Sequence, residues 1–540
     1  MTVRNSAVLL CLAMCAHNVS GAADPDTAAA IRRLEAALAR QEAELAAQRT
    51  HIESQDREIT ALRAAVNASS GEASVTRSTL SGVLTEQKHA RLQQQEAPRW
   101  SLNASRPTLA AADGRSTLAL RSLVQLDSSW YDQDDAGPLG TDFRRGSAGT
   151  GSNRENASAS DLGSGTNFRR ARLGVEGIFA RDFGYRFMAE FGGSGSESQT
   201  RLNDSWVSYS GFAPFTVQMG AFAPAANMDD STTPDDTLFP ERATPAELSR
   251  SLAGADGRVG FGIRGNGTRW MGALTLTGGT AGEAESFDEQ RGVVGRIGVL
   301  ALTGADNAWN LHLGASGSHV FRFADQGGPN VRYPLRLRDR PELRVDSTRL
   351  IDTGQIDADS AWAAGLELGA NWHNVYLQGE TFRFGVERRD NALEDPEFDG
   401  YYIQGSWVIT GESRRYNMAT GAFQAPRPVA PFSSGGGPGS WELAWRYSHT
   451  DLDVEAGVAG MPASPGAVRG GIQDIRSIGL NWTVNSNLKL MLDYMRVEVD
   501  RLNPATDGGL PFGPAPLTPP EGVQIGQDLD IYTLRTQFAF

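Results

Sequence analysis

The stretch DLDIYTLRTQFAF, residues Asp528–Phe540, ends the 540-residue chain and decides the fold. Apolar and polar side chains alternate along it, with Tyr532, Leu534, Phe538 and Phe540 on one face and Thr533, Arg535 and Gln537 on the other. Successive side chains of a strand point to opposite faces, so one face suits lipid and the other suits water. This ending favours a strand of an outer-membrane barrel, although a half-buried strand of a soluble sheet has the same pattern.

The same alternation recurs from about Ser116 onward. Apolar rows oppose polar ones in four clear segments, at 362–372, 441–448, 478–484 and 488–494. Aromatic residues stand at the ends of several rows, where a membrane interface favours them. The sequence therefore predicts an all-β fold, an antiparallel transmembrane β-barrel of about 16 strands over residues 116–540.

The N-terminus resembles a secretory signal peptide over residues 1–23. Arg4 precedes an apolar stretch, Ala7–Ala16, and small residues follow at Ser20–Ala23. This stretch is about half the ~20 residues that a spanning helix needs, so we expect export without a helical anchor. Both cysteines, Cys11 and Cys15, lie inside the expected signal, which excludes disulfides and cysteine–metal sites from the mature protein.

A heptad pattern follows the signal. Apolar residues recur every seven positions, at Ile31, Leu38, Leu45, Ile52, Ile59 and Val66. This spacing predicts an N-terminal α-helical coiled coil over residues 27–68. The alternative is a single amphipathic helix that lies on its own domain. Residues 69–115 are polar and aperiodic, and we expect a linker there.

Composition and motifs exclude several classes of function. The net charge of −14 argues against nucleic acid as a partner. The barrel's histidines are scattered, and the chain has neither a Gly-x-Ser-x-Gly elbow nor a His-Glu-x-x-His pair. Metal-ligand spacing is absent as well. We therefore expect no enzyme, no cofactor and no metal site.

The lengths of the connections give a topology. The link from Leu502 to Asp528 is long and proline-rich, whereas Asn485–Asn487 is a tight turn. Outer-membrane barrels have long extracellular loops and short periplasmic turns, which orients the chain with Phe540 toward the periplasm. One segment, Thr410–Gly439, is long yet falls on the periplasmic side, so we expect it to fold into the lumen.

Several segments resemble the phosphate-selective porin O/P family, in family order and over most of Ser116–Phe540. They are FRRARLGVEGIFARDFGYRFMAEF (Phe168–Phe191), PERA (Pro240–Ala243), VITGESRRYN (Val408–Asn417), SWELAWRYSHTDL (Ser440–Leu452) and the C-terminal stretch. The resemblance implies a sixteen-stranded homotrimeric porin in the outer membrane of a Gram-negative bacterium. It also implies a narrow anion-binding channel, with the coiled coil in the periplasm.

The same resemblance points to arginines at the constriction. The family's consecutive pair is similar to Arg169 and Arg170, and a further candidate is Arg121 on the first strand. Neighbours on a strand point to opposite faces, so alternation puts Arg170 and Arg172 inside and admits Arg169 only if the strand is irregular. The alternative is that these arginines are salt-bridge partners of Glu176 and Glu190.

The segment Phe222–Arg258 follows the fifth strand, where such porins fold a loop into the pore. Its acids include Asp229, Asp230, Asp235, Asp236 and Glu241, and its bases are Arg242, Arg250 and Arg258. The chain has only two lysines, Lys88 and Lys489, so the family's lysine ladder is missing. Arginines can replace it in part, because the planar guanidinium suits oxyanions. The long periplasmic link supplies Arg414, Arg415 and Arg427.

These features predict a passive diffusion channel with an arginine-lined constriction, for small anions such as phosphate or polyphosphate. A general or organic-nutrient porin remains an alternative, as does an envelope-tethering protein whose coiled coil binds peptidoglycan. The expected partners are small solutes, outer-membrane lipid and lipopolysaccharide, and two further copies of the chain.

Overall fold

The structure is a computed structural model that describes Thr60 and residues 99–103, 106–134, 162–193, 200–281, 288–304, 308–325, 334–504 and 521–540. The chain divides into two units, Met1–Gln95 and Glu96–Phe540. The expected signal peptide and nearly all of the expected coiled coil lie outside the described residues. The second unit holds all of the strands that the structure describes.

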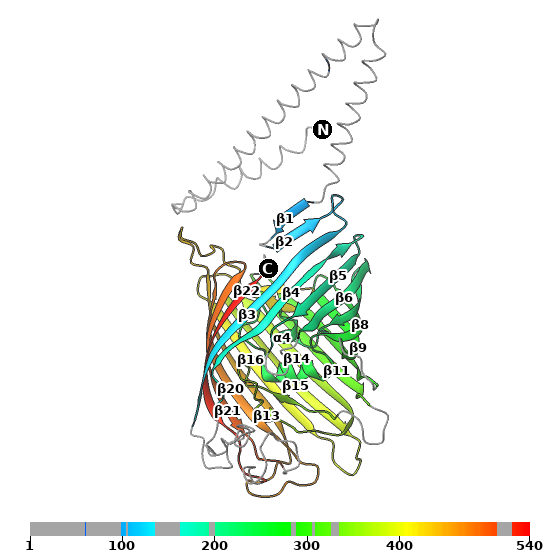
Figure 1. The fold of residues 1–540 in the computed structure, drawn as a ribbon, viewed down its shortest axis with the longest axis vertical. Helices are drawn as coiled ribbons and strands as arrows, with labels where there is room; N and C mark the ends of the chain where they lie inside the picture. The colour runs from blue at the N-terminus through cyan, green and yellow to red at the C-terminus, as the bar shows by residue number, and fades with distance from the viewer. Residues whose placement is uncertain are drawn as a thin grey trace. The chain divides into compact units, whose positions relative to one another are not determined.

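Sixteen antiparallel strands close into a barrel, as the sequence predicts (Figure 1). They are β3 (Thr117–Gln133), β4 (Gly165–Phe179), β5 (Phe183–Glu190), β6 (Arg201–Phe212), β7 (Phe215–Phe222), β8 (Arg258–Asn266), β9 (Trp270–Thr280), β10 (Arg291–Thr303), β11 (Trp309–Arg322), β14 (Ala358–Trp372), β15 (Val375–Arg388), β16 (Glu397–Val408), β19 (Ser440–Val454), β20 (Val468–Thr483), β21 (Leu488–Asp500) and β22 (Asp528–Ala539). Each pairs with the next, and β22 closes the ring against β3.

Alternation along the strands matches the two sides of the wall. On β22, Leu534 and Phe538 are exposed on the outer surface, while Arg535 and Gln537 are buried inside. On β14, Leu366 is 65% exposed, whereas its neighbour Glu367 is 4% exposed. Because a pleated strand has a period of two, the sequence alone predicts these faces.

Aromatic pairs mark the rim of the barrel. The ring centroids of Phe179 and Phe183 lie 5.0 Å apart on adjacent strands, and those of Trp441 and Trp482 also lie 5.0 Å apart. Rings at this height suit the interface between lipid and water. Phe179 and Phe183 flank the tight turn at 180–182, and Trp482 precedes the tight turn at 484–487.

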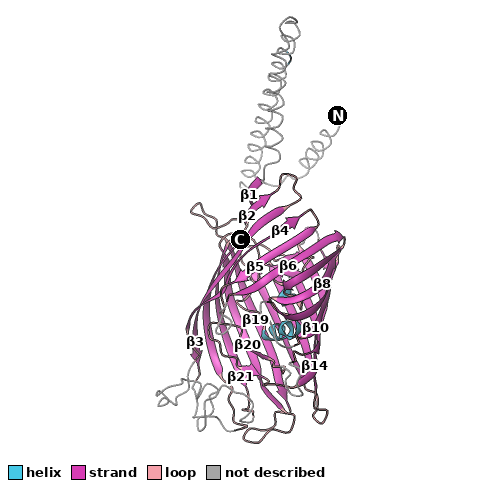
Figure 2. Ribbon diagram, turned by 45° about the vertical axis from the view of Figure 1, so that its right-hand side comes forward, coloured by secondary structure: helices cyan, strands magenta, loops and turns pink. Residues whose placement is uncertain are grey.

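The connections differ between the two ends of the barrel, which we call the short-turn end and the long-loop end (Figure 2). Phe540 lies at the short-turn end, where its backbone pairs with that of Ser122. The one long connection at this end is 409–439, which contains β17 (Arg415–Asn417) and β18 (Ala422–Gln424). Its residues Arg414, Ala422 and Phe423 are buried inside the barrel, as the topology predicts.

A hairpin precedes the barrel within the segment expected to be a linker. It comprises β1 (Arg99–Asn103) and β2 (Arg106–Ala110), and β2 pairs with the first residues of β3. The segment expected to be a linker therefore contains two paired strands at these residues. Strands of five residues are too short for alternation to reveal them in the sequence.

Two loops fill much of the barrel at its long-loop end. Residues 223–257, the inner loop, contain α4 (Met228–Ser231) and α5 (Thr244–Ala253). Residues 334–357, the capping loop, contain β12 (Arg338–Asp339) and β13 (Ile351–Asp352). Leu248 and Leu252 of α5 pack with Leu343 and Ile351 of the capping loop and with inward-facing Phe382.

This apolar packing was not expected from the sequence, which favours a polar lumen throughout. Within the part of the chain that the structure describes, a cavity lies in the short-turn half of the barrel, where charged and polar side chains line it together with Leu123, Met188 and Met271. Among the described residues, no helix is both long enough and apolar enough to cross a membrane.

Candidate functional site: the lumen beside the inner loop

Hydrogen bonds of Asn227 within the inner loop hold its two helices together. The side-chain oxygen of Asn227 accepts a hydrogen bond from the backbone N–H of Asp230 at 2.7 Å, which caps α4. The amide nitrogen of the same side chain donates to the carbonyl of Ala246 in α5 at 2.9 Å. Asn227 is fully buried and thus ties the two helices into one unit.

Glu241 anchors this unit to the strands that close the barrel. Its carboxylate accepts hydrogen bonds from the guanidiniums of Arg169 at 2.8 Å and Arg535 at 3.0 Å, and lies 3.4 Å from Arg170. Arg344 of the capping loop is 3.6 Å away. Burial alone would raise the pKa of Glu241, but the surrounding arginines outweigh it and hold the pKa well below its usual range.

A β-bulge allows both members of the Arg169–Arg170 pair to reach the lumen. Gln125 of β3 pairs with Arg170, whereas the next residue, Leu126, pairs with Phe168. Arg169 is therefore the extra residue, and the local kink turns it inward beside Arg170. Strict alternation would turn only one of these two arginines into the lumen, whereas the bulge turns both inward.

A second chain of ion pairs runs along the other side of the inner loop. Arg172 pairs with Glu190 at 2.6 Å and with Asp256 at 3.1 Å. Asp256 in turn pairs with Arg250 at 2.6 Å, and Arg250 with Asp230 at 2.5 Å. The pairing of Arg172 with Glu190 is the alternative that the sequence left open.

Glu380 and Arg296 hold the far side of the inner loop. Glu380 of β15 accepts the backbone N–H groups of Met228 and Asp229 at 2.8 and 2.9 Å. Arg296 of β10 pairs with Glu367 at 2.8 Å and also donates to Ser231. Its remaining donors reach the carbonyls of Thr420 and Gly421 beside β18, so one guanidinium joins the wall, the inner loop and the β17–β18 hairpin.

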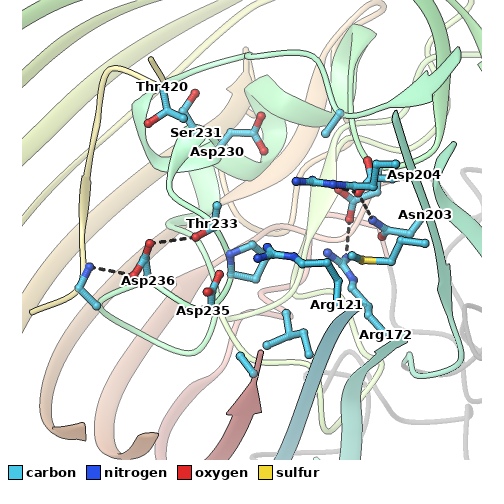
Figure 3. A pocket seen from close by; sticks show the side chains of 18 of the residues that line it. Arg121, Arg172, Asn203, Asp204, Asp230, Ser231, Thr233, Asp235, Asp236 and Thr420 are labelled. Atoms are coloured by element: carbon cyan, nitrogen blue, oxygen red, sulfur yellow. Dashed lines mark hydrogen bonds and ion pairs between the residues drawn. The ribbon is translucent and has the colours of Figure 1, made fainter. Parts of the chain in front are cut away.

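A cavity of about 460 Å³ lies between the inner loop and the strands near β3–β9. Figure 3 shows Asp235 and Asp236 of the inner loop on one side and Arg121 and Arg172 of the wall on the other. Among the described residues, eight basic and five acidic side chains line it. The basic ones are Arg106, Arg121, Arg172, Arg186, Arg242, Arg264, Arg427 and Lys489, and the acidic ones are Asp204, Asp230, Asp235, Asp236 and Asp256.

The structure distributes the predicted arginines between this cavity and the anchors of the loops. Those that line the cavity are Arg121, Arg172, Arg242 and Arg427. Those that lie outside its lining are Arg169, Arg170, Arg250, Arg258, Arg414 and Arg415. Arg414 is buried against Glu442 at 2.7 Å, and Arg258 donates to the carbonyls of Gly254 and Gly278.

The predicted acids divide in the same way. Asp230, Asp235 and Asp236 line the cavity, whereas Asp229 and Glu241 are buried and lie outside its lining. Asp229 accepts the backbone N–H of Ala243 at 3.1 Å. The side chain of Asp235 has no ion pair or hydrogen bond with any described residue.

Sequence reasoning missed several lining residues. Arg186 and Arg264 lie at inward positions of β5 and β8, and Arg106 lies on the hairpin. Alternation within YRF at 185–187 carries a signal for Arg186, because its neighbours Tyr185 and Phe187 face outward. No group of three or more histidine, cysteine, aspartate or glutamate side chains in the described part of the chain is placed to hold a metal ion.

Comparison with known proteins gives one family and several relatives. A model of the family described as "Phosphate-selective porin O and P" matches residues 142–540. Porin O of Pseudomonas aeruginosa is 25% identical over 356 residues, which cover 62% of this chain and 77% of that protein. An uncharacterized protein of Caulobacter vibrioides is 28% identical over 362 residues, covering 64% of this chain and 66% of that protein.

Solved structures are similar at lower identity. The anion-selective porin of Comamonas acidovorans is 13% identical, with a TM-score of 0.42, and the match covers 79% of this chain and 100% of that one. OmpT of Vibrio cholerae, in a form lacking loop L8, is 10% identical with a TM-score of 0.43, again over 79% of this chain and 100% of that one.

Proposed function

Because the chain belongs to the phosphate-selective porin O and P family, we propose that it forms a passive pore with a modest preference for small anions. Family membership makes the protein an outer-membrane porin, a channel for small solutes rather than an enzyme. The preference for anions is the part that we infer from the charges in the lumen.

The observation that carries the proposal is the imbalance of accessible charge. Most acids of the inner loop are already engaged by arginines, as Asp230 and Asp256 are by Arg250. Arg264 and Arg427, by contrast, are exposed in the cavity and have no ion-pair partner among the described residues. Fixed charge inside a low-dielectric wall concentrates counter-ions and repels co-ions, so an excess of guanidinium favours anions.

The size of the expected preference is modest because two acids of the cavity lining, Asp235 and Asp236, have no ion pair with any described residue and offset part of this basic charge. Asp235 stands on the inner loop across the cavity from the basic wall (Figure 3). Conduction also requires that a solute leave the site as readily as it enters. A channel in which all of the arginines were free would bind oxyanions too strongly to pass them quickly.

The test is the reversal potential of the purified protein in a planar bilayer under a gradient of potassium chloride. We expect a sign that corresponds to chloride crossing faster than potassium. Replacing Arg427 with alanine should shift the reversal potential toward zero. A wild-type channel that is neutral or cation-selective would refute the proposal.

A general porin is the second candidate, and one observation favours it. The guanidiniums of Arg169, Arg170 and Arg172 are all engaged by carboxylates, so the arginines that the family places at the constriction contribute little free charge. Inorganic phosphate separates the two candidates, since it should block chloride current in an anion-binding pore and leave a general pore unchanged.

The remaining expectations are proposals of the same kind. They are phosphate or polyphosphate as solutes, a homotrimer, contacts with lipid and lipopolysaccharide, and a periplasmic coiled coil that contacts peptidoglycan. The coiled coil falls outside the described residues, and cross-linking of the intact protein in cells would test it.

A further inference from the structure

The β1–β2 hairpin continues the wall of the barrel at the short-turn end. Strand β22 pairs with β3 from Gln133 as far as Leu123, and β2 pairs with β3 at Thr117–Ala119, beyond the end of β22 (Figures 1 and 2). Arg106 is the first residue of β2 and faces Asn103 across the tip of the hairpin. The tip therefore points back toward the mouth of the pore.

From this position Arg106 reaches into the cavity. Its guanidinium donates to the carboxylate of Glu176 on β4 at 2.7 Å. The other oxygen of Glu176 accepts from Arg186 on β5 at 2.7 Å and lies 3.7 Å from Arg121 on β3. Three arginines from three parts of the chain thus converge on one acid.

A fourth arginine faces the same space. Arg264 of β8 lines the cavity, and its side chain has no ion pair or hydrogen bond with any described residue. Arg186 lines the same cavity, and its guanidinium lies 5.4 Å from the ring centroid of Trp206. Asp204 lies 3.7 Å from Arg186, and Asp235 is the remaining acid near this end.

The positive charges of Arg106, Arg121, Arg186 and Arg264 exceed the negative charges near them. Four guanidiniums face Glu176, Asp204 and Asp235, and the side chains of Arg106, Arg186 and Glu176 are 33%, 30% and 20% exposed. Water and solute can therefore reach them. A guanidinium presents several N–H donors in one plane, an arrangement that matches the oxygens of phosphate, sulfate or a carboxylate.

We propose that Arg106, Arg121, Arg186 and Arg264 form an oxyanion-binding site at the short-turn mouth of the pore, completed by the hairpin that precedes the barrel. The inference rests on the proposed anion preference and adds a site to it. Arg106 and Arg121 both precede residue 142, where the match to the family begins, so the family model does not cover them. The N-terminal segment thereby takes part in the choice of solute.

The test measures reversal potential and phosphate block of chloride current in planar bilayers, with the full-length protein. Removing one charge about 6 Å from a passing ion in water should change the local concentrations of chloride and of potassium by about threefold each, in opposite directions, and so change the chloride-to-potassium permeability ratio by about tenfold. We expect R106A to lower the ratio by this factor and to raise the phosphate concentration that blocks half the current. The R121A/R264A variant should lower the ratio further, and E176Q should raise it.

The matched control is R115A, because Arg115 is exposed in the connection after β2 and does not line the cavity. R106C allows the same folded, open channel to be compared before and after chemical modification, so the comparison does not depend on how well the variant folds. A cationic methanethiosulfonate reagent added to the open channel should restore the anion preference, and an anionic one should reduce it further.

The two proposals fail in different ways. An anion-selective wild type whose selectivity and phosphate block are unchanged in R106A, and in R106C after either reagent, would overturn the site and leave the proposed function standing. A wild type without anion preference would overturn the proposed function itself, and with it the site.

Discussion

Replacing Glu241 with glutamine removes the charge that holds the inner loop against the closing strands. The side chain of Glu241 is 6% exposed and lies within 3.6 Å of four guanidiniums, those of Arg169, Arg170, Arg344 and Arg535. Asp127 remains as a partner of Arg535 at 2.5 Å, and Glu247 as a partner of Arg344 at 2.8 Å. Arg169 and Arg170 would have no carboxylate left.

Breaking a buried ion pair from one side costs about 3–5 kcal/mol, because the remaining charge stays desolvated. Glutamine keeps the volume and one acceptor, so we expect the lower end, a loss of about 3 kcal/mol in the free energy of unfolding. The freed guanidiniums should also increase anion preference, since the net charge beside the loop rises by one.

The assay is urea-induced unfolding in lipid vesicles, monitored by tryptophan fluorescence. Reversal potentials in planar bilayers are measured on the same variants. E394Q is the control, because Glu394 is exposed in the connection between β15 and β16 and has the same substitution. If E241Q unfolded at the same urea concentration as wild type and kept its selectivity, Glu241 would not anchor the loop.

Three other variants test the 409–439 segment, the outer face of β14 and the capping loop. R296A should expose the 409–439 segment to limited proteolysis, because Arg296 donates to the carbonyls of Thr420 and Gly421, and R269A, in an exposed turn, should not. L366R, near the middle of β14 on the outer face, should cost about 2–4 kcal/mol of stability in lipid, whereas L366F should cost little; equal unfolding midpoints would show that this face does not meet lipid. Burial raises the pKa of Asp339 to about 7, so the folded protein holds a proton there that the unfolded chain releases near pH 4, and the stabilisation present at low pH is lost as the pH rises through 7. D339N should therefore raise the unfolding midpoint at pH 8 more than at pH 5, and an equal change at both values would contradict this.

Local patterns predict those features that depend on a short stretch of chain. The faces of β14 and β22, the tight turn at Asn485–Asn487 and the inward course of 409–439 all follow from a period of two and from counting strands. Arg172 is placed inside by the same argument. The hairpin at 99–110 was missed because five-residue strands carry too few alternations.

The sequence by itself determined which residues face outward from the barrel, that the chain crosses the wall about 16 times, and that arginines stand near an acidic loop. Only the tertiary structure decided which charges neutralise one another. Glu241 meets Arg169 and Arg535, which are 72 and 294 residues away, because the barrel closes β22 onto β3 and the inner loop folds across that seam. Coulomb energy depends on distance in space, and the register of a closed sheet sets that distance. No local pattern in the sequence therefore shows that Arg106 reaches Glu176, or that Arg264 has no ion-pair partner among the described residues.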